Sequence, residues 1–514
     1  MPGDDFKEAS LYSTVFGWKL RLSIKIKIDF SMQINRRNFL KAAGVATVSA
    51  MLPTKGISRE IPAEKQQSSK SLEKIYREAY KKHSQKFNMC GYTAPKLETV
   101  RVGFVGVGNR GSAAVERISR IDGVKIVAIC DELSEHAEKA KARIQTPGHP
   151  ALVYSGKEDS WMEMCRRDDI DLVYVAAPWE WHAPIGVYSM RQSKHVALEI
   201  PVATTVEDCW QLVETSEETK KHCVILENCC YDFFELLTLN LARNGFFGEI
   251  VHAEGGYIHE IGESLFFRGK PGRSWRLKEN MRRNGNLYPT HGLGPVAQIM
   301  NINRGNRMEY MVSMSSDDFL MNQYSQELSL KEDYFKQFEG ASFRGNMNSS
   351  IIKTIKGQTI LIQHDITTPR PYSRLHTISG TKATAQKYPL PPRLSMAGDH
   401  KEWLSEDKFK EIERRYNPPI IKKMQDIAKE IGGHGGMDFL MDWRLIDCLR
   451  NGLPVDMDVY DAASWSVIGP LSEWSVANRS APIDIPDFTN GAWKKNQPHD
   501  ISLKHGGTTG VVTK

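Results

Sequence analysis

Short apolar runs alternate with amphipathic stretches along the first half of the chain. The apolar runs that we interpret as strands are residues 100–105, 124–130, 170–178, 195–199 and 223–228. The segments with helical periodicity between them are residues 112–120, 184–192 and 205–220. Strands of this length that alternate with helices are typical of a parallel sheet covered by helices. The pattern predicts a Rossmann-type α/β domain over residues 99–231.

The second half of the chain has a different pattern. Its predicted strands are residues 250–257, 308–315, 343–354 and 359–367. Helical periodicity returns at residues 437–451 and 460–479, and we expect these late helices to pack back onto the body of the protein. The sequence therefore predicts an α+β domain with an open, mostly antiparallel sheet over residues 232–490, followed by a tail at 491–514.

A charged segment followed by a short apolar stretch lies near the N-terminus. Residues 36–41 spell Arg-Arg-Asn-Phe-Leu-Lys, and small apolar residues fill 42–52. This arrangement resembles a twin-arginine export signal, and its apolar stretch is too short to span a bilayer. We expect residues 1–52 to be an upstream extension and signal, with Met32 as the natural start. The alternative is an ordinary amphipathic helix.

The polar segment that follows is predicted to be a linker and a lead-in helix. Residues 53–98 are rich in Lys, Gln and Ser, and a helix is expected at 72–83. No other long apolar run is present, so the mature protein is expected to have no stable membrane span. Together with the signal, this predicts an exported protein of the bacterial periplasm or cell surface.

Composition and cysteine usage exclude several classes of partner. The 514 residues carry 68 Lys+Arg against 62 Asp+Glu, which gives a net charge of +6 without a basic stripe, so we expect no nucleic-acid partner. The 8 cysteines form no CxxC pair and no Cys/His group with zinc spacing, so no metal site is predicted. We expect buried free thiols rather than a disulfide framework.

A glycine-rich turn joins the first predicted strand to the first predicted helix. Residues 106–111 spell Gly-Val-Gly-Asn-Arg-Gly. In a dinucleotide fingerprint, Gly106 would allow the tight turn, Gly108 would let the backbone approach a pyrophosphate, and Gly111 would let the helix pack on the strand. The helix N-terminus then offers free N–H groups to the phosphates. The motif has the strand and helix context that a dinucleotide site requires.

An acidic residue closes the second predicted strand. Asp131 follows Gly111 by 20 residues, which is the spacing at which a carboxylate binds the adenosine ribose hydroxyls. The next residue is Glu132 rather than Arg, so a ribose 2′-phosphate would be repelled. The sequence therefore favours NAD over NADP as the cofactor.

Several polar and aromatic residues follow the later strands. Trp179 and His182 lie on the predicted loop after the third strand, Glu199 ends the fourth and Asn228 ends the fifth. Ligands of open parallel sheets bind at the carboxyl ends of the strands. These four residues are therefore expected to line the cofactor groove, and simple strand-end packing is the alternative.

The order of these motifs resembles the glucose–fructose oxidoreductase/inositol dehydrogenase superfamily, and most closely glycoside hydrolase family 109. Most superfamily members carry Glu-Lys-Pro at the position where residues 199–201 spell Glu-Ile-Pro here. The usual downstream Asp…His pair of the dehydrogenases is also not evident. The family 109 motifs are Gly-Asn-Arg-Gly at 108–111, Trp-Glu-Trp-His at 179–182, Glu-Asn-Cys-Cys-Tyr at 227–231, Tyr-Pro-Thr-His at 288–291 and Gly-His-Gly-Gly at 433–436.

The resemblance implies an NAD-dependent α-N-acetylgalactosaminidase that acts on terminal N-acetylgalactosamine, with the sugar bound between two domains. The NAD contacts it implies are Asn109, Arg110, Asp131, Trp179, Glu180, Trp181, His182, Glu199, Ile200 and Asn228. The sugar contacts it implies are Tyr257, Arg276, Tyr288, His291 and Tyr372. The resemblance to the superfamily also implies a possible homo-oligomer that forms through the exposed face of the second sheet.

The second half offers no obvious pair of acids for direct hydrolysis. A pair of Asp or Glu residues normally flanks the scissile glycosidic bond, and none can be identified here. We therefore expect oxidation at C3, elimination, water addition and re-reduction, with retention. His291 would be the base because histidine titrates near neutral pH, and Tyr288 would handle the C3 hydroxyl proton. A structural Tyr-His helix cap is the alternative for this pair.

Four functions remain open from the sequence. The first is the NAD-dependent glycosidase, and the second is an exported NAD(P)-dependent sugar oxidoreductase on the same scaffold. The third is a glycosidase with another sugar or anomer specificity. The fourth is a sugar or nucleotide sensor without catalysis. Ile200, in place of the superfamily Lys, favours the first over the second.

Overall fold

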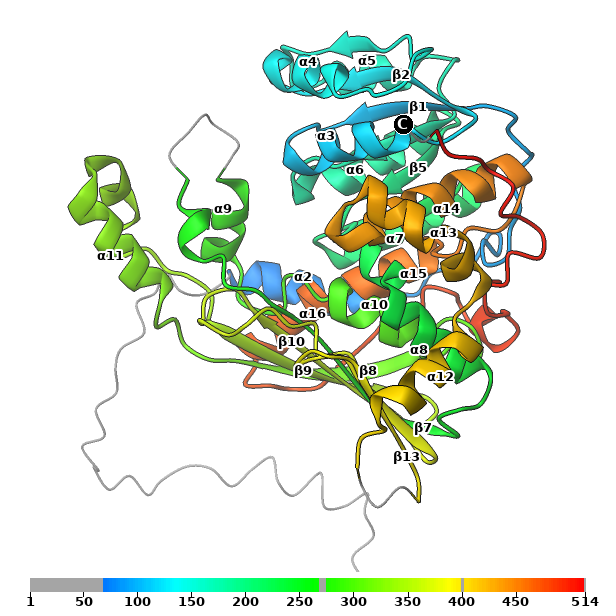
Figure 1. Cartoon of the computed structure of the whole chain (residues 1–514). Coiled ribbons are helices and arrows are strands. Elements are labelled where there is room, and N and C mark those ends of the chain that lie inside the picture. Colours follow the sequence, from blue (N-terminus) through cyan, green and yellow to red (C-terminus); the bar gives the residue numbers. More distant parts are fainter. Residues whose placement is uncertain (1–67, 268–273, 399–401, 513–514) are drawn as a thin grey trace, which may run out of the picture. The chain divides into compact units, whose positions relative to one another are not determined.

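Six parallel strands form the first of two sheets (Figure 1), in the order β3-β2-β1-β4-β5-β6. The strands are β1 (Val100–Val105), β2 (Val124–Cys130), β3 (Leu152–Tyr154), β4 (Leu172–Val175), β5 (His195–Leu198) and β6 (Cys223–Ile225). Their interiors are continuously apolar because helices cover both faces of a parallel sheet. Phe104 and Val105, which point to opposite faces of β1, are 0% and 5% exposed.

The computed structural model describes residues 68–267, 274–398 and 402–512. All of them belong to one compact unit that spans residues 62–514. The predicted extension and signal, and the predicted linker up to residue 67, lie outside the described residues. The predicted lead-in helix is present as α2 (Ser69–Ala79). None of the described helices is long and apolar enough to cross a membrane.

The helices of the first sheet follow its strands in the predicted alternation. They are α3 (Asn109–Ile118), α4 (Ser134–Ala142), α5 (Ser160–Cys165), α6 (Trp179–Arg191) and α7 (Val206–Thr219). Trp179 and His182 were expected on a loop, but they lie in the first turn of α6, because the helix begins directly after Pro178. The short edge strand β3 was not predicted, since its three residues carry too little apolar pattern.

The second sheet has eight strands in the order β13-β12-β11-β7-β10-β9-β8-β14. They are β7 (Ile250–Ile258), β8 (Met308–Ser315), β9 (Met347–Thr354), β10 (Thr359–Asp365), β11 (Thr377–Gly380), β12 (Ala383–Gln386), β13 (Arg393–Met396) and β14 (Ile483–Asp484). The β7–β10 pair is parallel, and the other pairs between these strands are antiparallel. The predicted α/β class with an open, mostly antiparallel second sheet is confirmed.

Helices of the second half pack around both sheets. They are α8 (Phe233–Arg243), α9 (Trp275–Arg282), α10 (Thr290–Ile299), α11 (Met321–Lys331), α12 (Glu406–Tyr416), α13 (Pro419–Ile431), α14 (Met437–Asn451), α15 (Val459–Ser466) and α16 (Ile468–Ala477). The predicted helix at 460–479 is two helices. The break follows from Pro470, whose ring excludes the carbonyl of Ser466 four residues earlier.

One glycine contact fixes α10 against the second sheet. A Cβ on Gly292 would lie 2.1 Å from the backbone N of Gly256, and one on Gly255 would lie 2.3 Å from the carbonyl O of Gly292. Only glycine at these positions lets the α10 backbone touch β7 directly. The contact brings His291, at the start of α10, next to Tyr257, which shares the Gly255 face of β7.

The other face of this sheet carries exposed apolar side chains. Tyr310 and Met314 on β8 are 40% and 66% exposed, and Ile351 on the neighbouring β9 is 50% exposed. The buried residues of β8, such as Met311, alternate with these and face the helices. One face of the sheet therefore carries both the helices and Tyr257.

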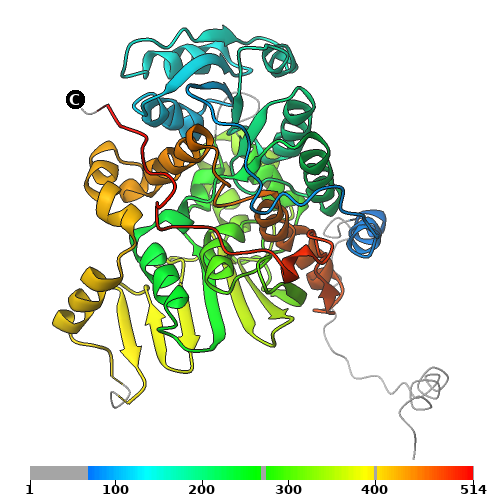
Figure 2. The ribbon, with the colours of Figure 1, turned by 90° about the vertical axis from the view of Figure 1, so that its right-hand side faces the viewer.

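The predicted C-terminal tail packs against the body of the protein (Figure 2). We call its residues 507–511 the strap. Val511 bridges to Ile121 of the first half, and the Trp443 indole N–H donates to the Thr509 carbonyl at 3.0 Å. Asp447 of α14 is fully buried, and its carboxylate accepts the backbone N–H groups of residues 507–509 at 2.6–3.2 Å. The strap thus ties α14 to the parallel sheet.

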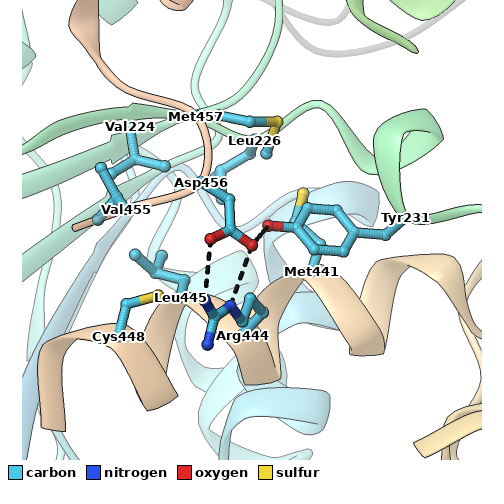
Figure 3. A pocket seen from close by; sticks show the side chains of 10 residues that line it. All are labelled: Val224, Leu226, Tyr231, Met441, Arg444, Leu445, Cys448, Val455, Asp456 and Met457. Atoms are coloured by element: carbon cyan, nitrogen blue, oxygen red, sulfur yellow. Dashed lines mark hydrogen bonds and ion pairs between the residues drawn. The ribbon is translucent and has the colours of Figure 1, made fainter. Parts of the chain in front are cut away.

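A buried ion pair joins α14 to the loop before α15 (Figure 3). Asp456 accepts two hydrogen bonds from Arg444, at 3.0 and 3.1 Å, and one from the Tyr231 hydroxyl at 3.1 Å. The cavity beside them is only about 10 Å³, which suits at most one water molecule. This cluster is structural and cannot hold a sugar or a nucleotide.

We expect Asp447→Asn to lower the free energy of unfolding by about 1–3 kcal/mol, because a buried carboxylate acceptor of several N–H groups becomes a neutral amide. Urea unfolding measures the change, and limited proteolysis reports release of the strap. Asp333→Asn is the control, since the Asp333 side chain is 91% exposed. An equal loss in both variants would contradict the role of Asp447.

Buried histidines should make the protein sensitive to acid. Burial lowers the pKa of His222 to about 4, and burial with Lys387 and Arg374 lowers the pKa of His376 to about 3. The unfolded chain therefore binds protons first as pH falls below about 6.5, so stability is full above that pH and declines towards pH 4. We expect a loss of about 3 kcal/mol per histidine between pH 7 and pH 4, with a smaller loss in His222→Gln. Urea unfolding across this range is the measurement, and a pH-independent free energy would contradict it.

Candidate active site

The glycine-rich turn between β1 and α3 has the geometry of a phosphate cradle. Gly106 has φ +79°, and a Cβ added to it would lie 2.6 Å from the backbone N of Ala177. A Cβ on Gly111 would lie 2.0 Å from the Gly106 carbonyl O. By contrast, nothing described lies within 4 Å of a Cβ on Gly108, which precedes the first residue of α3. The turn is therefore tight on the protein side and open where a pyrophosphate would approach.

Asp131 is held rigidly at the carboxyl end of β2. One carboxylate oxygen accepts the Val107 N–H at 2.8 Å, and the other accepts the Leu133 N–H at 3.0 Å. The His136 ring lies 3.3 Å from the second oxygen. The carboxylate thus faces the groove beside the glycine turn, as a ribose ligand must.

A single cleft runs from this turn to the second half of the chain. Its volume is about 820 Å³. The lining includes Gly106, Gly108, Asn109, Arg110 and Asp131 at one end and Trp275 and Arg276 of α9 at the other. Trp181 and Pro178, after β4, lie along its wall. The space suits a dinucleotide that reaches from the glycine turn towards Arg276.

The strand-end residues expected to line the groove are mostly beneath its surface. Trp179, His182, Glu199, Ile200 and Asn228 are between 1% and 7% exposed, whereas Glu180 is exposed on α6. His182 has both ring nitrogens facing carbonyl oxygens, Pro201 O at 2.8 Å and Ala177 O at 2.7 Å. Burial lowers the pKa of this ring. His182 therefore ties the loops after β4 and β5 together below the cleft.

Arg110 links the glycine turn to the start of α14. Its guanidinium contacts Glu199 at 2.5 Å and Asp438 at 2.7 Å. Asp438 also accepts from the Asn228 amide at 2.5 Å. Burial opposes the charge of Arg110, but these two carboxylates raise its pKa well above the ordinary value. The predicted cofactor residues Arg110, Glu199 and Asn228 thus form one polar network, to which Asp438 adds a member that sequence reasoning missed.

Aromatic rings enclose the guanidinium of Arg276. Its Cζ atom lies 4.9 Å from the Tyr288 ring centre, 5.5 Å from Trp179 and 5.7 Å from Tyr257. Its Nε and Nη2 atoms are buried and have no hydrogen-bond partner among the described residues. Unpaired buried donors are costly, so they mark a place where oxygen atoms of a ligand are expected. Arg276, Tyr257 and Tyr288 are brought together as predicted.

His291 completes this group and is fixed by a buried carboxylate. Its ring lies 5.0 Å from Tyr288 and 5.4 Å from Tyr257, both edge to face. Its Nδ1 lies 2.7 Å from Oε1 of Glu227, a residue that is 0% exposed. Burial raises the pKa of Tyr288 well above its ordinary value, so its hydroxyl stays protonated. Glu227 follows the β6 strand end, where the rule applied to Asn228 would also have found it.

Tyr372 lies at the edge of the same group. It is 39% exposed, contacts the His259 ring at 5.1 Å, and accepts a hydrogen bond from Arg374 at 3.3 Å. Arg374 is buried and paired with Asp232 and Glu235, at 2.5 and 2.7 Å. His259 in turn lies 3.0 Å from the Tyr257 hydroxyl. Tyr372 therefore contacts Tyr257 indirectly, through the His259 ring. Its hydroxyl is held by Arg374, which is paired with the two carboxylates.

His434 is an exposed histidine at the open side of this region. It lies in the glycine-rich segment before α14, where Gly433, Gly435 and Gly436 all have positive φ. Its Nδ1 is 2.9 Å from Asp438, while its side chain is 62% exposed. The ring is therefore open to solvent on one side and held by a buried carboxylate on the other. The sequence singled out this segment but assigned it no role.

Three potential metal-binding atoms also meet beside His291. Glu227, Cys229 and His291 are the one group of His, Cys, Asp or Glu side chains among the described residues that could hold a metal ion. Their potential ligand atoms lie within 4.8 Å of one another. The His291–Glu227 hydrogen bond already occupies this space, and burial raises the pKa of Cys229 well above its ordinary value, which opposes a thiolate. We interpret the group as a hydrogen-bonded cluster. All 8 cysteines are free, and seven of them are buried.

Comparison with known proteins identifies the family. Residues 231–495 match the family model of the glycosyl hydrolase 109 C-terminal domain, and residues 100–227 match that of the oxidoreductase family with an NAD-binding Rossmann fold. The chain belongs to glycosyl hydrolase family 109. Residues 33–53 match the model of a twin-arginine translocation signal sequence.

Family 109 relatives align over most of the chain. A Glycosyl hydrolase family 109 protein of Porphyromonas gingivalis is 47% identical over 415 residues, which is 78% of this chain and 87% of the relative. An Alpha-N-acetylgalactosaminidase of Bacteroides fragilis is 47% identical over 412 residues, 79% of this chain and 96% of the relative. Family 109 proteins are glycosidases, so this chain is assigned glycosidase activity.

The solved structures that resemble this chain share its fold. A levoglucosan dehydrogenase in complex with NADH and levoglucosan has a TM-score of 0.57 and 16% identity, and the match covers 76% of this chain and 100% of that one. An NAD binding oxidoreductase from Klebsiella pneumoniae has a TM-score of 0.56 and 14% identity, with 76% and 99% covered. At this identity the likeness concerns the fold alone.

We expect Gly108→Ala to weaken dinucleotide binding by at least about 10-fold while leaving the unliganded protein as stable as the wild type, because the new methyl enters open space at the phosphate position. Calorimetric titration with NAD and thermal unfolding without it give the two quantities. Gly111→Ala is the matched control, since its methyl would clash with the turn and should lower stability as well. Unchanged affinity in Gly108→Ala would argue against the cradle.

Proposed function

We propose that this chain hydrolyses terminal α-linked N-acetylgalactosamine with NAD as a resident cofactor. One observation carries the proposal: a single cleft joins the glycine turn and Asp131 to the unpaired donors of Arg276. A dinucleotide in that cleft would bring its reactive end to a sugar held by Arg276 and the surrounding aromatic rings. The 47% identity to the Alpha-N-acetylgalactosaminidase of Bacteroides fragilis supports the choice of sugar.

The carboxylates of this region are unsuited to direct acid hydrolysis. Two carboxyl groups would have to flank the bond, one of them protonated and both open to the substrate. Glu227 is 0% exposed and bonded to His291, and Glu199 is 7% exposed and paired with Arg110. Neither group can reach a glycosidic oxygen without breaking these contacts. The geometry therefore supports the redox and elimination route.

The residues of the cleft fit NAD, and when bound it would accept a hydride from C3 of the sugar and return it at the end of the cycle. Gly106, Gly108 and Gly111 would cradle the pyrophosphate, and Asp131 would bind the adenosine ribose. Below the cleft, the network of Arg110, Glu199 and Asn228 would hold the wall in place. The half-buried Trp181 of α6 borders the same cleft, and Glu180, which precedes it on α6, is exposed.

Protons on the sugar would be handled by the second half of the chain. Tyr288, whose hydroxyl stays protonated, would relay the C3 hydroxyl proton as the carbonyl forms, accepting it on its oxygen while its own proton passes to water. The carbonyl would then acidify the proton at C2. His291 would remove the C2 proton while the C1–O bond breaks and the aglycone leaves with the electron pair. Water would then add to C1, and His291 would return a proton to C2. Addition from the face that the aglycone left gives retention.

Arg276, Tyr257 and Tyr372 would hold the sugar during these steps. Arg276 has two unpaired donors for hydroxyl or acetamide oxygens. Tyr257 presents its ring beside His291, and Tyr372 presents a partly exposed hydroxyl at the edge of the site. We further propose that the matched signal delivers the folded protein to the periplasm or the cell surface.

The proposal predicts two isotope results with the purified holoprotein and nitrophenyl α-N-acetylgalactosaminide. Deuterium at C3 of the substrate should slow turnover, because that C–H bond breaks. In D₂O, the released sugar should carry deuterium at C2.

His291→Ala should keep bound NAD and lose turnover by about 10²–10⁴-fold. Nitrophenol release and mass spectrometry of the sugar are the measurements.

Two results would overturn the proposal. Release of the sugar with neither a C3 isotope effect nor C2 exchange would exclude the elimination route. Accumulation of NADH from free sugars, without cleavage of glycosides, would instead establish a sugar oxidoreductase.

A further inference from the structure

A buried carboxylate supports the ring of His291 from below. Oε1 of Glu227 lies 2.7 Å from His291 Nδ1 and accepts the Cys229 N–H at 3.0 Å. A carboxylate has no proton to donate, so the His291 hydrogen bond requires a proton on Nδ1. The other ring nitrogen, Nε2, is then left as an acceptor.

The packing of α10 leaves room for this carboxylate. Gly294 lies three residues after His291, on the same side of the helix. A Cβ on Gly294 would lie 2.9 Å from Cγ of Glu227 and 3.1 Å from Sγ of Cys230. Any larger residue would push Glu227 away from the helix. The close approach of Glu227 to α10 therefore depends on this glycine.

Glu227 is held in its ionised form. Burial alone would raise its pKa, but the His291 ring, the Thr290 hydroxyl and the Cys229 N–H together lower the pKa of Glu227 below its usual value. A buried anion beside an imidazole stabilises the positive charge that the ring gains when it takes a proton.

We propose that Glu227 is a positioning residue that selects the Nδ1–H tautomer of His291, aims Nε2 at the sugar and stabilises the protonated ring. This inference rests on the proposed role of His291 and extends it to a residue of the nucleotide-binding half. Glu227 follows β6, whereas His291 begins α10. The base would therefore be correctly formed only when the two halves of the molecule are packed together.

Other charged and titratable groups surround the ring. Tyr288 before α10, Tyr257 of β7 and Cys229 after β6 lie next to it. His259, after β7, interacts electrostatically with His291, Arg276 of α9 and His434 before α14, and Arg276 lies over the Tyr288 and Tyr257 rings. Among the described residues, Glu227 is the carboxylate that accepts a hydrogen bond from His291. Its removal should therefore dominate any change in the pH dependence.

The test compares Glu227→Gln with wild-type holoenzyme. A Gln amide can present an N–H to Nδ1, which favours the opposite tautomer. We expect kcat to fall about 10-fold to 100-fold, with KM and NAD affinity changed by less than about 3-fold. The acidic limb of kcat against pH should move to lower pH. In ¹⁵N spectra of histidine-labelled protein, the His291 ring should change from Nδ1–H towards Nε2–H.

Three further comparisons keep the test decisive. Glu217→Gln is the matched control, because Glu217 is 2% exposed and accepts hydrogen bonds from the Lys86 N–H and the Tyr460 hydroxyl away from His291. It should leave the tautomer and the pH profile unchanged. Glu227→Asp keeps the charge and should recover part of kcat if Glu227→Gln folds poorly. In a His291→Gln background, Glu227→Gln should cause no further loss.

The outcomes separate this inference from the proposed function. An unchanged His291 tautomer and full kcat in Glu227→Gln would overturn the positioning role, even if the wild type cleaves the glycoside by the proposed route. A changed tautomer in a wild-type protein that lacks glycosidase activity would instead support the positioning role and reject the proposed function.

Discussion

The candidate active site depends on the direct contact between α10 and β7. Two glycines, Gly255 and Gly292, let a helix backbone touch a strand backbone with no side chain between them. His291 precedes Gly292, and Tyr257 follows Gly255 by two residues, so the contact sets the distance between their rings. A methyl group at either glycine would separate the helix from the sheet and move His291 away from Tyr257.

The site is built from residues of both halves of the chain, and charge holds the halves together. Arg110 of the glycine turn bonds to Asp438 of α14, and Glu227 after β6 bonds to His291 of α10. The carboxylates of Asp438 and Glu227 are buried, so each would be costly without its partner. The ionic contacts thus make the geometry of the site depend on correct packing of the two sheets and their helices.

Sequence patterns predicted the fold well where periodicity was strong. The strands at 100–105, 124–130 and 308–315 and the helix at 437–451 have the predicted bounds. The split at Pro470 could have been anticipated from its missing N–H and its ring. The short strands β3 and β11 to β14 could not, because two to four residues carry no distinguishable period. Their pairing is decided by neighbouring strands.

The sequence alone determined the dinucleotide cradle, because the glycines, the helix start and Asp131 act through local backbone geometry. It also indicated Tyr288 and His291 as partners, since they lie three residues apart. Only the tertiary structure decided which groups surround them. Arg276, Tyr257 and Glu227 are separated from His291 by 15 to 64 positions in the chain, and their meeting depends on the α10–β7 contact. Long-range packing of this kind leaves no spacing rule in the sequence, so the unpaired donors of Arg276 and the carboxylate beneath His291 became visible only in the folded molecule.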